Sequence, residues 1–291
     1  MSELKGIVKK NILIVGITGF LGINLVKAIN EKYNDIYNIV GISRSKDKIL
    51  KLNNQYKHLK IYSLDIVKDN TNLENIFRDI KIDYVINTAA LKYVDKCENN
   101  PLNCVEVNLI SVIELIKLSV KYNVKNLISI SSDKANKPIN NYGMSKYLMQ
   151  QIIKQHNFSY YEGVNFFWSD GSVLDIWFKL IQEGKDICVT NFNQERYFIE
   201  VNNICFDILN NIDKKNSVIK STNIFRVKLI DLFNAFTEYF KYDKEKCIVI
   251  GDQINEKVIS TNSKEYNNIS KNEIIKKIKN YIDDNKLVIN I

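Results

Sequence analysis

An apolar run that leads directly into a glycine-rich loop near the start of the chain limits the possible folds more than any other feature. Asn11–Val15 is typical of a buried strand, and Gly16-Ile-Thr-Gly19-Phe-Leu-Gly22 follows it and opens an amphipathic segment. Glycines are needed where a strand turns tightly into a helix that packs close against it. The pattern indicates the first strand–helix unit of a parallel sheet.

Short β-branched runs alternate with amphipathic segments through the first half of the chain. After Asn11–Val15, the expected strands are Tyr37–Ile42, Leu59–Ser63, Tyr84–Asn87 and Asn126–Ile130. Strands that alternate with helices form a parallel sheet with helices on its faces. We therefore predict an α/β fold, with a Rossmann-type parallel sheet and a second, smaller mixed α/β domain.

Composition changes after about Phe158, where the regular alternation gives way to shorter elements rich in aromatic residues. We expect one domain over residues 1–160 and the smaller one over residues 161–291, with approximate boundaries and interleaved chain segments. Thr71 and Glu74 have the spacing of a capping box, and Asn100-Pro101 is typical of a helix start. Asn272–Tyr281 has apolar residues at helical spacing, which predicts a helix docked on the surface.

The charge and the cysteine content favour an ordinary protein of a reducing compartment. The formal net charge is +8 and the pI about 9.0, but the lysines are spread along the chain, so we expect no nucleic-acid partner. Five cysteines without a CxxC pair, and only two histidines, predict neither a disulfide framework nor a metal site. No apolar run approaches about 18 residues, so we expect a soluble, cytoplasmic protein without a membrane segment.

The glycine loop predicts a dinucleotide site, because a helix that starts there points its N-terminus at a pyrophosphate. The expected contacts are Gly16, Thr18, Gly19, Phe20, Leu21 and Gly22. At the end of the second strand, the carboxylate that would bind the ribose of NAD is replaced by Ser43 and Arg44, with Lys46 beyond them. A guanidinium can bind a 2′-phosphate, so the predicted cofactor is NADP. The alternatives are a plain turn and an exposed basic loop.

A tyrosine and a lysine carry the predicted chemistry. Tyr142 and Lys146 are separated by four residues, which places both side chains on one face of a helix. An ammonium there would lower the pKa of the phenol, so that Tyr142 could act as a base toward a hydroxyl whose carbon loses hydride. The strand Asn126–Ile130 ends just before Ser131-Ser132, which strengthens the prediction. The alternative is a solvated helix face.

Together these motifs resemble the extended short-chain dehydrogenase/reductases, and four segments resemble the C5-inverting UDP-N-acetylglucosamine 4,6-dehydratases over most of the chain. The segments begin at Ala89 (AALKYV), Cys97 (CENNP), Ser131 (SSDKA) and Asn140 (NNYGMSK). The resemblance implies that Asp133 protonates the departing C6 hydroxyl, Lys134 takes part in proton transfer at C5, and Ser132 binds the C4 oxygen. It also implies that Asp65 and Ile66 bracket the adenine, and that Ala89 and Ala90 pass beneath the cofactor.

The same resemblance implies a UDP-sugar partner bound mainly by the smaller domain, and a homo-oligomer, either a dimer or a hexamer. The implied substrate contacts are Lys92, Asn165, Ser172, Val173, Thr190, Arg196 and Glu256, with Glu98 a further candidate. Two family arginines are absent: Glu162 and Gln253 occupy their positions.

The expected enzyme is a hydro-lyase that forms UDP-2-acetamido-2,6-dideoxy-β-L-arabino-hex-4-ulose. The alternative enzyme is a nucleotide-sugar 4-epimerase or 4-reductase. It would need Tyr142 and Lys146, but Asp133 and Lys134 would have no role in its reaction. A non-catalytic NADP-binding Rossmann protein is the alternative from another class.

Overall fold

A parallel sheet of seven strands organises the first of two compact units. The computed structural model describes residues 8–221, 223–251 and 266–287. The first unit runs to Gly163 and also includes Val201–Lys220, and the second contains Val164–Glu200 and the chain from Ser221 onward. Each unit is described by itself below.

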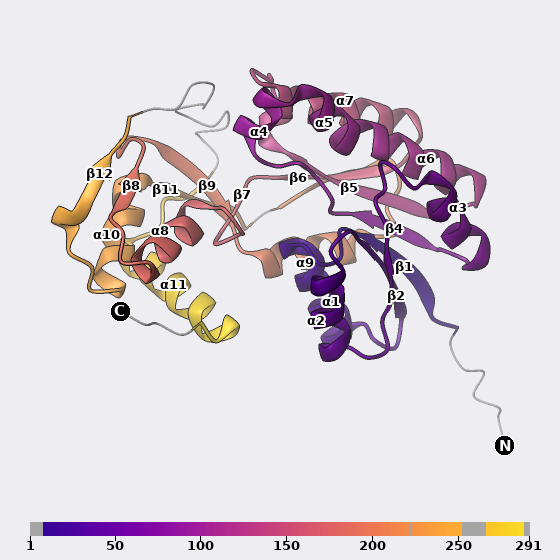
Figure 1. Cartoon of the computed structure of the whole chain (residues 1–291), viewed down its shortest axis with the longest axis horizontal. Coiled ribbons are helices and arrows are strands. Elements are labelled where there is room, and N and C mark those ends of the chain that lie inside the picture. Colours follow the sequence, from indigo (N-terminus) through magenta and orange to yellow (C-terminus); the bar gives the residue numbers. More distant parts are fainter. Residues whose placement is uncertain (1–7, 222, 252–265, 288–291) are drawn as a thin grey trace. The chain divides into compact units, whose positions relative to one another are not determined.

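The strand order in the first unit is β10-β6-β5-β4-β1-β2-β3, and all neighbours pair in parallel (Figure 1). The strands are β1 (Lys10–Val15), β2 (Tyr37–Ser43), β3 (Lys60–Ser63), β4 (Tyr84–Asn87), β5 (Asn126–Ser132), β6 (Ser159–Gly163) and β10 (Val218–Lys220). The five strands expected from the sequence are confirmed with shifts of one or two residues at their ends, and so is the Rossmann-type fold class.

Helices cover both faces of this sheet, with α1 and α2 on one face and α3, α6 and α7 on the other (Figure 1). The helices are α1 (Phe20–Lys32), α2 (Lys46–Gln55), α3 (Asn70–Asp79), α4 (Val94–Asn99), α5 (Pro101–Val105), α6 (Ser111–Lys121), α7 (Asn141–Gln155) and α9 (Val201–Asn210). Two short turns join them, the π-helical η1 (Glu106–Ile110) and the 3-10 turn η2 (Asp133–Ala135).

Alternate residues of each strand face opposite layers of the core. Leu13 and Val15 of β1 pack in one apolar cluster with Leu115 of α6 and Met149 of α7. Ile12 and Ile14 point to the other face and are also fully buried. A sheet buried on both faces explains why its strands are nearly continuous apolar runs in the sequence.

Of the two helix starts predicted from caps, one is confirmed and one is wrong. Asn100 accepts a hydrogen bond from the backbone N–H of Asn103, and Pro101 begins α5. The capping box at Thr71 does not form, because α3 already begins at Asn70. Glu74 instead accepts hydrogen bonds from Lys121 at 2.5 Å and Tyr122 at 3.0 Å.

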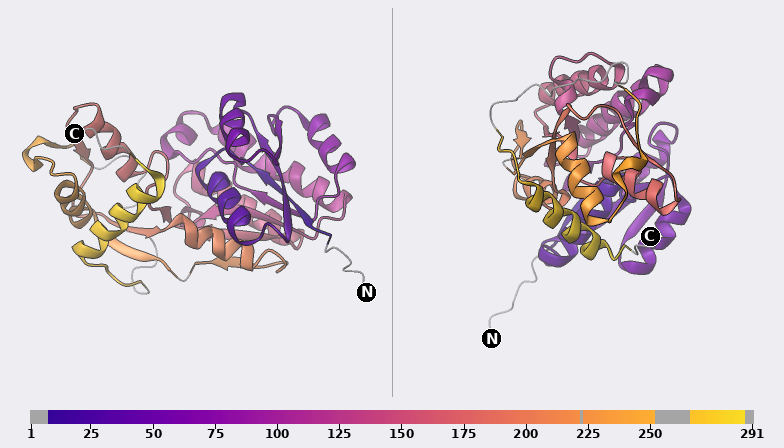
Figure 2. Two further views of the ribbon diagram at one scale, coloured as in Figure 1. Left: turned by 90° about the horizontal axis from the view of Figure 1, so that it is seen from below. Right: turned by 90° about the vertical axis from the view of Figure 1, so that its left-hand side faces the viewer.

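Among its described residues, the second unit holds two small sheets and three α-helices around an aromatic core. Its elements are β7 (Asn165–Phe166), α8 (Val173–Gln182), β8 (Ile187–Val189), β9 (Glu195–Ile199), β11 (Phe225–Lys228), α10 (Leu229–Tyr239), η3 (Lys244–Lys246), β12 (Cys247–Val249) and α11 (Lys271–Asn285). The predicted surface helix is confirmed as α11, which packs beside α10 (Figure 2) and buries Ile274, Ile278 and Ile282. Over the described residues, no helix is both long and apolar enough to span a bilayer.

Candidate active site

The glycine loop between β1 and α1 makes a tight cradle, packed so closely on neighbouring backbone that two of its glycines have no room for a side chain. Gly16 has φ +80°, and a Cβ built on it would lie 2.9 Å from the backbone N of Ala89. A Cβ on Gly22 would lie 2.5 Å from the carbonyl oxygen of Gly16. Because α1 begins at Phe20, the N–H groups of its first turn have no acceptor inside the helix. The cradle therefore suits an anionic group such as a pyrophosphate.

The end of β2 lies next to this loop. Thr18 and Ser43 are buried and share a hydrogen bond of 2.5 Å between their hydroxyl oxygens. Arg44 and Lys46 are exposed, and Ser45 caps α2 by accepting from the N–H of Lys48. The sheet thus brings the predicted ribose-side residues beside the predicted pyrophosphate loop.

The other predicted cofactor residues lie at the ends of β3 and β4, on the same edge of the parallel sheet. Asp65 accepts from the N–H of Val67 at 3.0 Å, and Ile66 is buried. Ala89 donates its N–H to the side chain of Asn87 at 3.2 Å, and Ala90 is exposed. This edge is where doubly wound sheets bind ligands.

Tyr142 and Lys146 occupy one buried face of α7, one turn apart. Asn140 caps the helix by accepting from the N–H of Gly143 at 2.8 Å. Tyr142 packs against Cys97 and Cys104 in a small apolar cluster. Lys146 is only 2% exposed and donates from Nζ to the carbonyl of Ile130 at 2.8 Å. The helix and the shared face predicted from the spacing are confirmed.

Burial dominates the protonation of both groups. It raises the pKa of Tyr142, while a hydrogen bond with Ser132 lowers that pKa and the charge of Asp133 raises it. Burial lowers the pKa of Lys146 to about 8. The prediction that the ammonium lowers the pKa of Tyr142 is wrong for this structure, because loss of solvation outweighs the other influences on the phenol.

Ser132, Asp133 and Lys134 lie together where β5 ends. Ser132 caps the η2 turn through the N–H of Lys134 and donates from its hydroxyl to Asp133 at 2.9 Å. The Lys134 ammonium lies 3.6 Å from the Asp133 carboxylate. The side chains of Asp133 and Lys134 are both partly exposed. Ser132 also forms a hydrogen bond with Tyr142, so a carboxyl group and an amine lie close to the Ser132–Tyr142 pair.

Two buried polar residues near this site were missed in the sequence. Asn108 of η1 is fully buried, donates to the carbonyl of Leu91 at 3.0 Å and accepts from its N–H at 2.8 Å. Gln150 of α7 donates to the hydroxyl of Ser131 at 2.8 Å. Asn108 could have been noticed in the sequence as a polar residue between the apolar residues Val107 and Leu109. For Gln150 the only signal was its position one helical turn after Lys146.

The predicted substrate contacts divide between the two units. In the first unit, Lys92 is exposed, with Nζ 5.4 Å from the ring centre of Tyr93, and Glu98 accepts from the N–H of Asn141 at the start of α7. Glu256 and Gln253 lie outside the described residues.

In the second unit, Thr190 and Arg196 both contact Gln194, at 3.2 Å and 2.6 Å. Asn165 donates to the carbonyl of Tyr197 at 3.0 Å. Ser172 caps α8, and Val173 is its first residue. These residues therefore stabilise loops and strand ends of the second unit.

Comparison with known proteins identifies the family. A family model described as "Polysaccharide biosynthesis protein" matches residues 12–279. The chain belongs to this polysaccharide biosynthesis protein family. A curated family relative, the UDP-N-acetylglucosamine 4,6-dehydratase (inverting) of Campylobacter jejuni, is 30% identical over 265 residues, which cover 87% of this chain and 78% of the relative. The resemblance read from the sequence motifs is thereby confirmed.

Solved structures share the fold at lower identity. The X-ray structure of Pen from Bacillus thuringiensis has a TM-score of 0.82 and 23% identity, covering 94% of this chain and 99% of that one. DesIV, a dTDP-glucose 4,6-dehydratase from Streptomyces venezuelae with NAD and TYD bound, also has a TM-score of 0.82, at 12% identity over 95% of this chain and 98% of that one. Both show that this polysaccharide biosynthesis protein shares the fold of these structures.

Proposed function

We propose that this chain is a UDP-N-acetylglucosamine 4,6-dehydratase that inverts C5. The observation that carries the proposal is the group at the end of β5, where Ser132, Asp133 and Lys134 stand beside the buried Tyr142. Loss of water across C5 and C6 needs an acid and a base in addition to the groups that oxidise C4. The name of the Campylobacter jejuni relative supports the same reaction.

The proposed cofactor is NADP, held by the glycine loop, by Ser43 and Arg44, and by the residues that follow β3 and β4. The chemistry that NADP supplies when bound is removal of a hydride from C4 and its return at C6. The tight turn at Gly16 and the close helix–strand approach at Gly22 support the geometry of a dinucleotide loop, in which the first turn of α1 faces a pyrophosphate. The absence of a carboxylate at the end of β2, and the exposed Arg44 there, support the 2′-phosphate.

In the proposed mechanism, Tyr142 reacts as the phenolate and takes the proton of the C4 hydroxyl, and Ser132 donates a hydrogen bond to the C4 oxygen. Lys146, held by the carbonyl of Ile130, places a positive charge in the buried site when it is protonated. The C5 proton becomes acidic once C4 is a ketone, and Lys134 then takes part in its removal. Asp133 protonates the leaving C6 hydroxyl, and a proton delivered to the opposite face of C5 inverts that centre.

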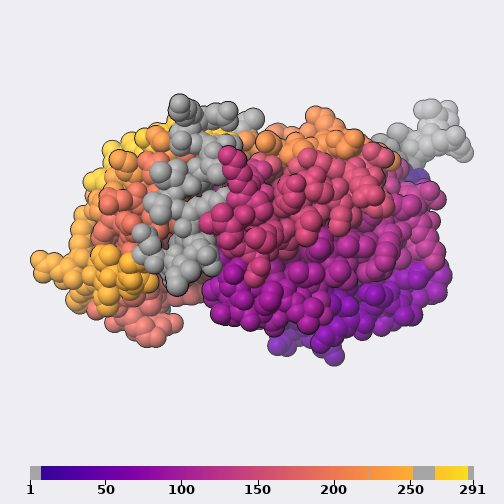
Figure 3. Space-filling model, turned by 90° about the horizontal axis from the view of Figure 1, so that it is seen from above, coloured from indigo at the N-terminus to yellow at the C-terminus, as the bar shows by residue number. Residues whose placement is uncertain are grey.

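We also propose that the protein is a homo-oligomer. Large hydrophobic side chains that are 39% or more exposed lie on α5, η1 and α7 of the first unit, namely Leu102, Val105, Ile110, Met144, Tyr147 and Leu148. Figure 3 shows the surface of this part of the chain, coloured purple to magenta. Because α7 contacts both α5 and η1, these side chains come from adjoining elements, and adjoining exposed apolar side chains are typical of surfaces that bind another chain.

The experiment is to incubate the purified protein with NADP and UDP-N-acetylglucosamine and to identify the product by NMR. The proposal expects a 4-keto-6-deoxy sugar with its methyl signal. A 4-epimer would indicate the epimerase, and unchanged substrate would indicate the non-catalytic binding protein; either result would reject the dehydratase.

A further inference from the structure

Glu162 is a largely buried carboxylate beside the turn that carries Asp133 and Lys134. It lies on β6, where it pairs in register with Ser131 of β5 and with Lys220 of β10. Its side chain is 13% exposed. A carboxylate at this depth needs partners that compensate for its lost hydration.

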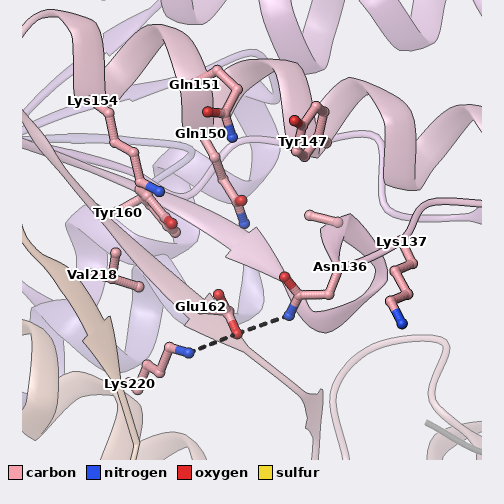
Figure 4. Close-up of a pocket in the computed structure, with 11 residues that line it drawn as sticks. Asn136, Lys137, Tyr147, Gln150, Gln151, Lys154, Tyr160, Glu162, Val218 and Lys220 are labelled. Atoms are coloured by element: carbon pink, nitrogen blue, oxygen red, sulfur yellow. Dashed lines mark hydrogen bonds and ion pairs between the residues drawn. The ribbon is translucent and has the colours of Figure 1, made fainter. Parts of the chain in front are cut away.

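Those partners connect Glu162 to the turn. Its Oε1 accepts a hydrogen bond from the side-chain amide of Asn136 at 3.0 Å and lies 3.4 Å from the ammonium of Lys220 (Figure 4). Asn136 directly follows η2, and its backbone N–H donates to the carbonyl of Asp133 at 3.0 Å, which closes the turn. Glu162 therefore ties the end of the turn to the sheet.

The start of the same turn is held from β5. Ser132 caps η2, and the neighbouring hydroxyl of Ser131 accepts from Gln150 of α7. With Glu162 at the other end, η2 is fixed on both sides. The turn is only three residues long, so a shift of its end would move the side chains of Asp133 and Lys134.

The surroundings of Glu162 explain why the position carries a negative charge in this chain. Glu162 lines a cavity of about 390 Å³ together with Lys137, Lys154 and Lys220. Figure 4 shows Lys220 and Asn136 approaching its carboxylate from β10 and from the turn. An arginine, the family residue at this position, would face the ammonium of Lys220 and lose the acceptor for Asn136.

We infer that Glu162 is a positioning residue for the dehydration step. This inference rests on the proposed function: Glu162 holds the Asp133–Lys134 turn where acid and base reach C6 and C5, and it leaves the oxidation of C4 by Tyr142 untouched. No proton passes through Glu162 itself. Its loss should slow the steps after C4 oxidation selectively.

The test compares three variants, Glu162→Ala, Glu162→Gln and Asn136→Ala, with the wild type. Glu74→Gln is the matched control, because Glu74 also accepts a hydrogen bond from a lysine of the first unit but lies on α3, away from the turn. Glu162→Ala and Asn136→Ala should each lower kcat about tenfold, since small displacements of catalytic groups have effects of this size or larger, with KM nearly unchanged. Glu162→Gln keeps an oxygen for Asn136 and should retain most of the activity. Glu74→Gln should behave as wild type.

Isotope effects identify the affected step. With substrate deuterated at C4, the isotope effect on kcat should be smaller in Glu162→Ala than in wild type, and the solvent isotope effect should be larger. An unchanged kcat in Glu162→Ala, or a lowered kcat whose C4 isotope effect is not reduced, would overturn the inference.

Hydrogen exchange separates this inference from the proposed function. In Glu162→Ala the backbone amides of η2 and Asn136 should exchange about tenfold faster, with Glu162→Gln close to wild type, whether or not the protein turns over a UDP-sugar. Unchanged exchange in this turn overturns the positioning role. Wild-type protein inactive on UDP-N-acetylglucosamine would instead reject the proposed function, and the exchange result would still decide whether Glu162 holds the turn.

Discussion

At the scale of single residues, the sequence determines which side chains meet, while burial determines their protonation. The four-residue spacing of Tyr142 and Lys146 is visible in the sequence and places both groups on one face of α7. Their pKa values follow from depth in the core, which no local pattern reports. The shared helix face of Tyr142 and Lys146 could therefore be predicted, but their protonation could not.

Tyr142→Phe and Asp133→Asn should stop the reaction at different steps. Without the phenol hydroxyl, C4 oxidation loses its base, so kcat should fall by about a hundredfold or more. Asp133→Asn should leave C4 oxidation possible but block water loss, because an amide cannot protonate the C6 hydroxyl. The absorbance of reduced cofactor after mixing with substrate checks this: a transient in Asp133→Asn and none in Tyr142→Phe. Near-full activity of Tyr142→Phe would contradict the mechanism.

The lowered pKa of Lys146 should appear as a pH dependence of stability. In the folded protein this pKa is about 8, below its ordinary value of 10.5. Between these values the unfolded chain binds the proton and the folded protein does not, so this contribution to the free energy of unfolding rises with pH, by at most about 1.4 kcal/mol per pH unit.

Urea denaturation of wild type and Lys146→Met, compared from pH 7.5 to about 10, measures this contribution. The difference between the two free energies of unfolding should stay level below pH 8 and then increase in favour of wild type. A difference that stays constant or falls over this range would contradict the assignment.

Arg44 should decide between the two nicotinamide cofactors. Its guanidinium is exposed beside Ser43 at the end of β2, and a hydrogen bond to a charged group contributes about 1.5–3 kcal/mol. Arg44→Ala should therefore weaken NADP binding about tenfold or more and leave NAD almost unaffected, with Lys51→Ala on α2 as the control. Calorimetric titration with both cofactors checks this, and equal affinity of the wild type for NAD and NADP would refute it.

At the scale of elements, patterns confined to one strand or helix could be predicted and those that depend on neighbours could not. The glycine loop and the cap at Asn100 are local, and the structure has them as expected. The capping box at Thr71 does not form because α3 begins at Asn70, and Glu74 instead bonds to residues on α6 and just after it. The π-helical turn that places Asn108 is equally set by contacts far along the chain.

Gly22→Ala tests whether the strand and helix must approach as closely as the structure shows. The new methyl would lie 2.5 Å from the carbonyl of Gly16, closer than a Cβ can approach. Overpacking of this kind costs about 1–3 kcal/mol, so we expect a lower Tm and weaker cofactor binding. Lys27→Ala, on the exposed side of α1, is the control and should change neither. A Gly22→Ala protein with wild-type Tm and cofactor affinity would show that the loop can accommodate a methyl group, which would contradict the prediction.

At the scale of the whole molecule, interleaved segments were expected from the sequence, but it did not indicate which segment returns to the first unit. Val201–Lys220 rejoins the sheet, where β10 pairs with β6 and supplies Lys220 to Glu162. A three-residue strand and a short amphipathic helix carry no signal that distinguishes them from the elements of the second unit. The positioning role of Glu162 is inferred partly from its contact with Lys220. From the sequence alone, only the absence of the family arginine at this position could be seen.

The most direct test of the account is the reaction run in deuterated water with purified protein, NADP and UDP-N-acetylglucosamine. We expect every product molecule to carry solvent deuterium at C5 with inverted configuration, because the proton removed there is not the one delivered to the opposite face. One hydrogen at C6 should come from C4 of the same molecule. A product without C5 deuterium, or with no loss of water, would contradict the dehydratase; C5 deuterium with retained configuration would contradict the inversion.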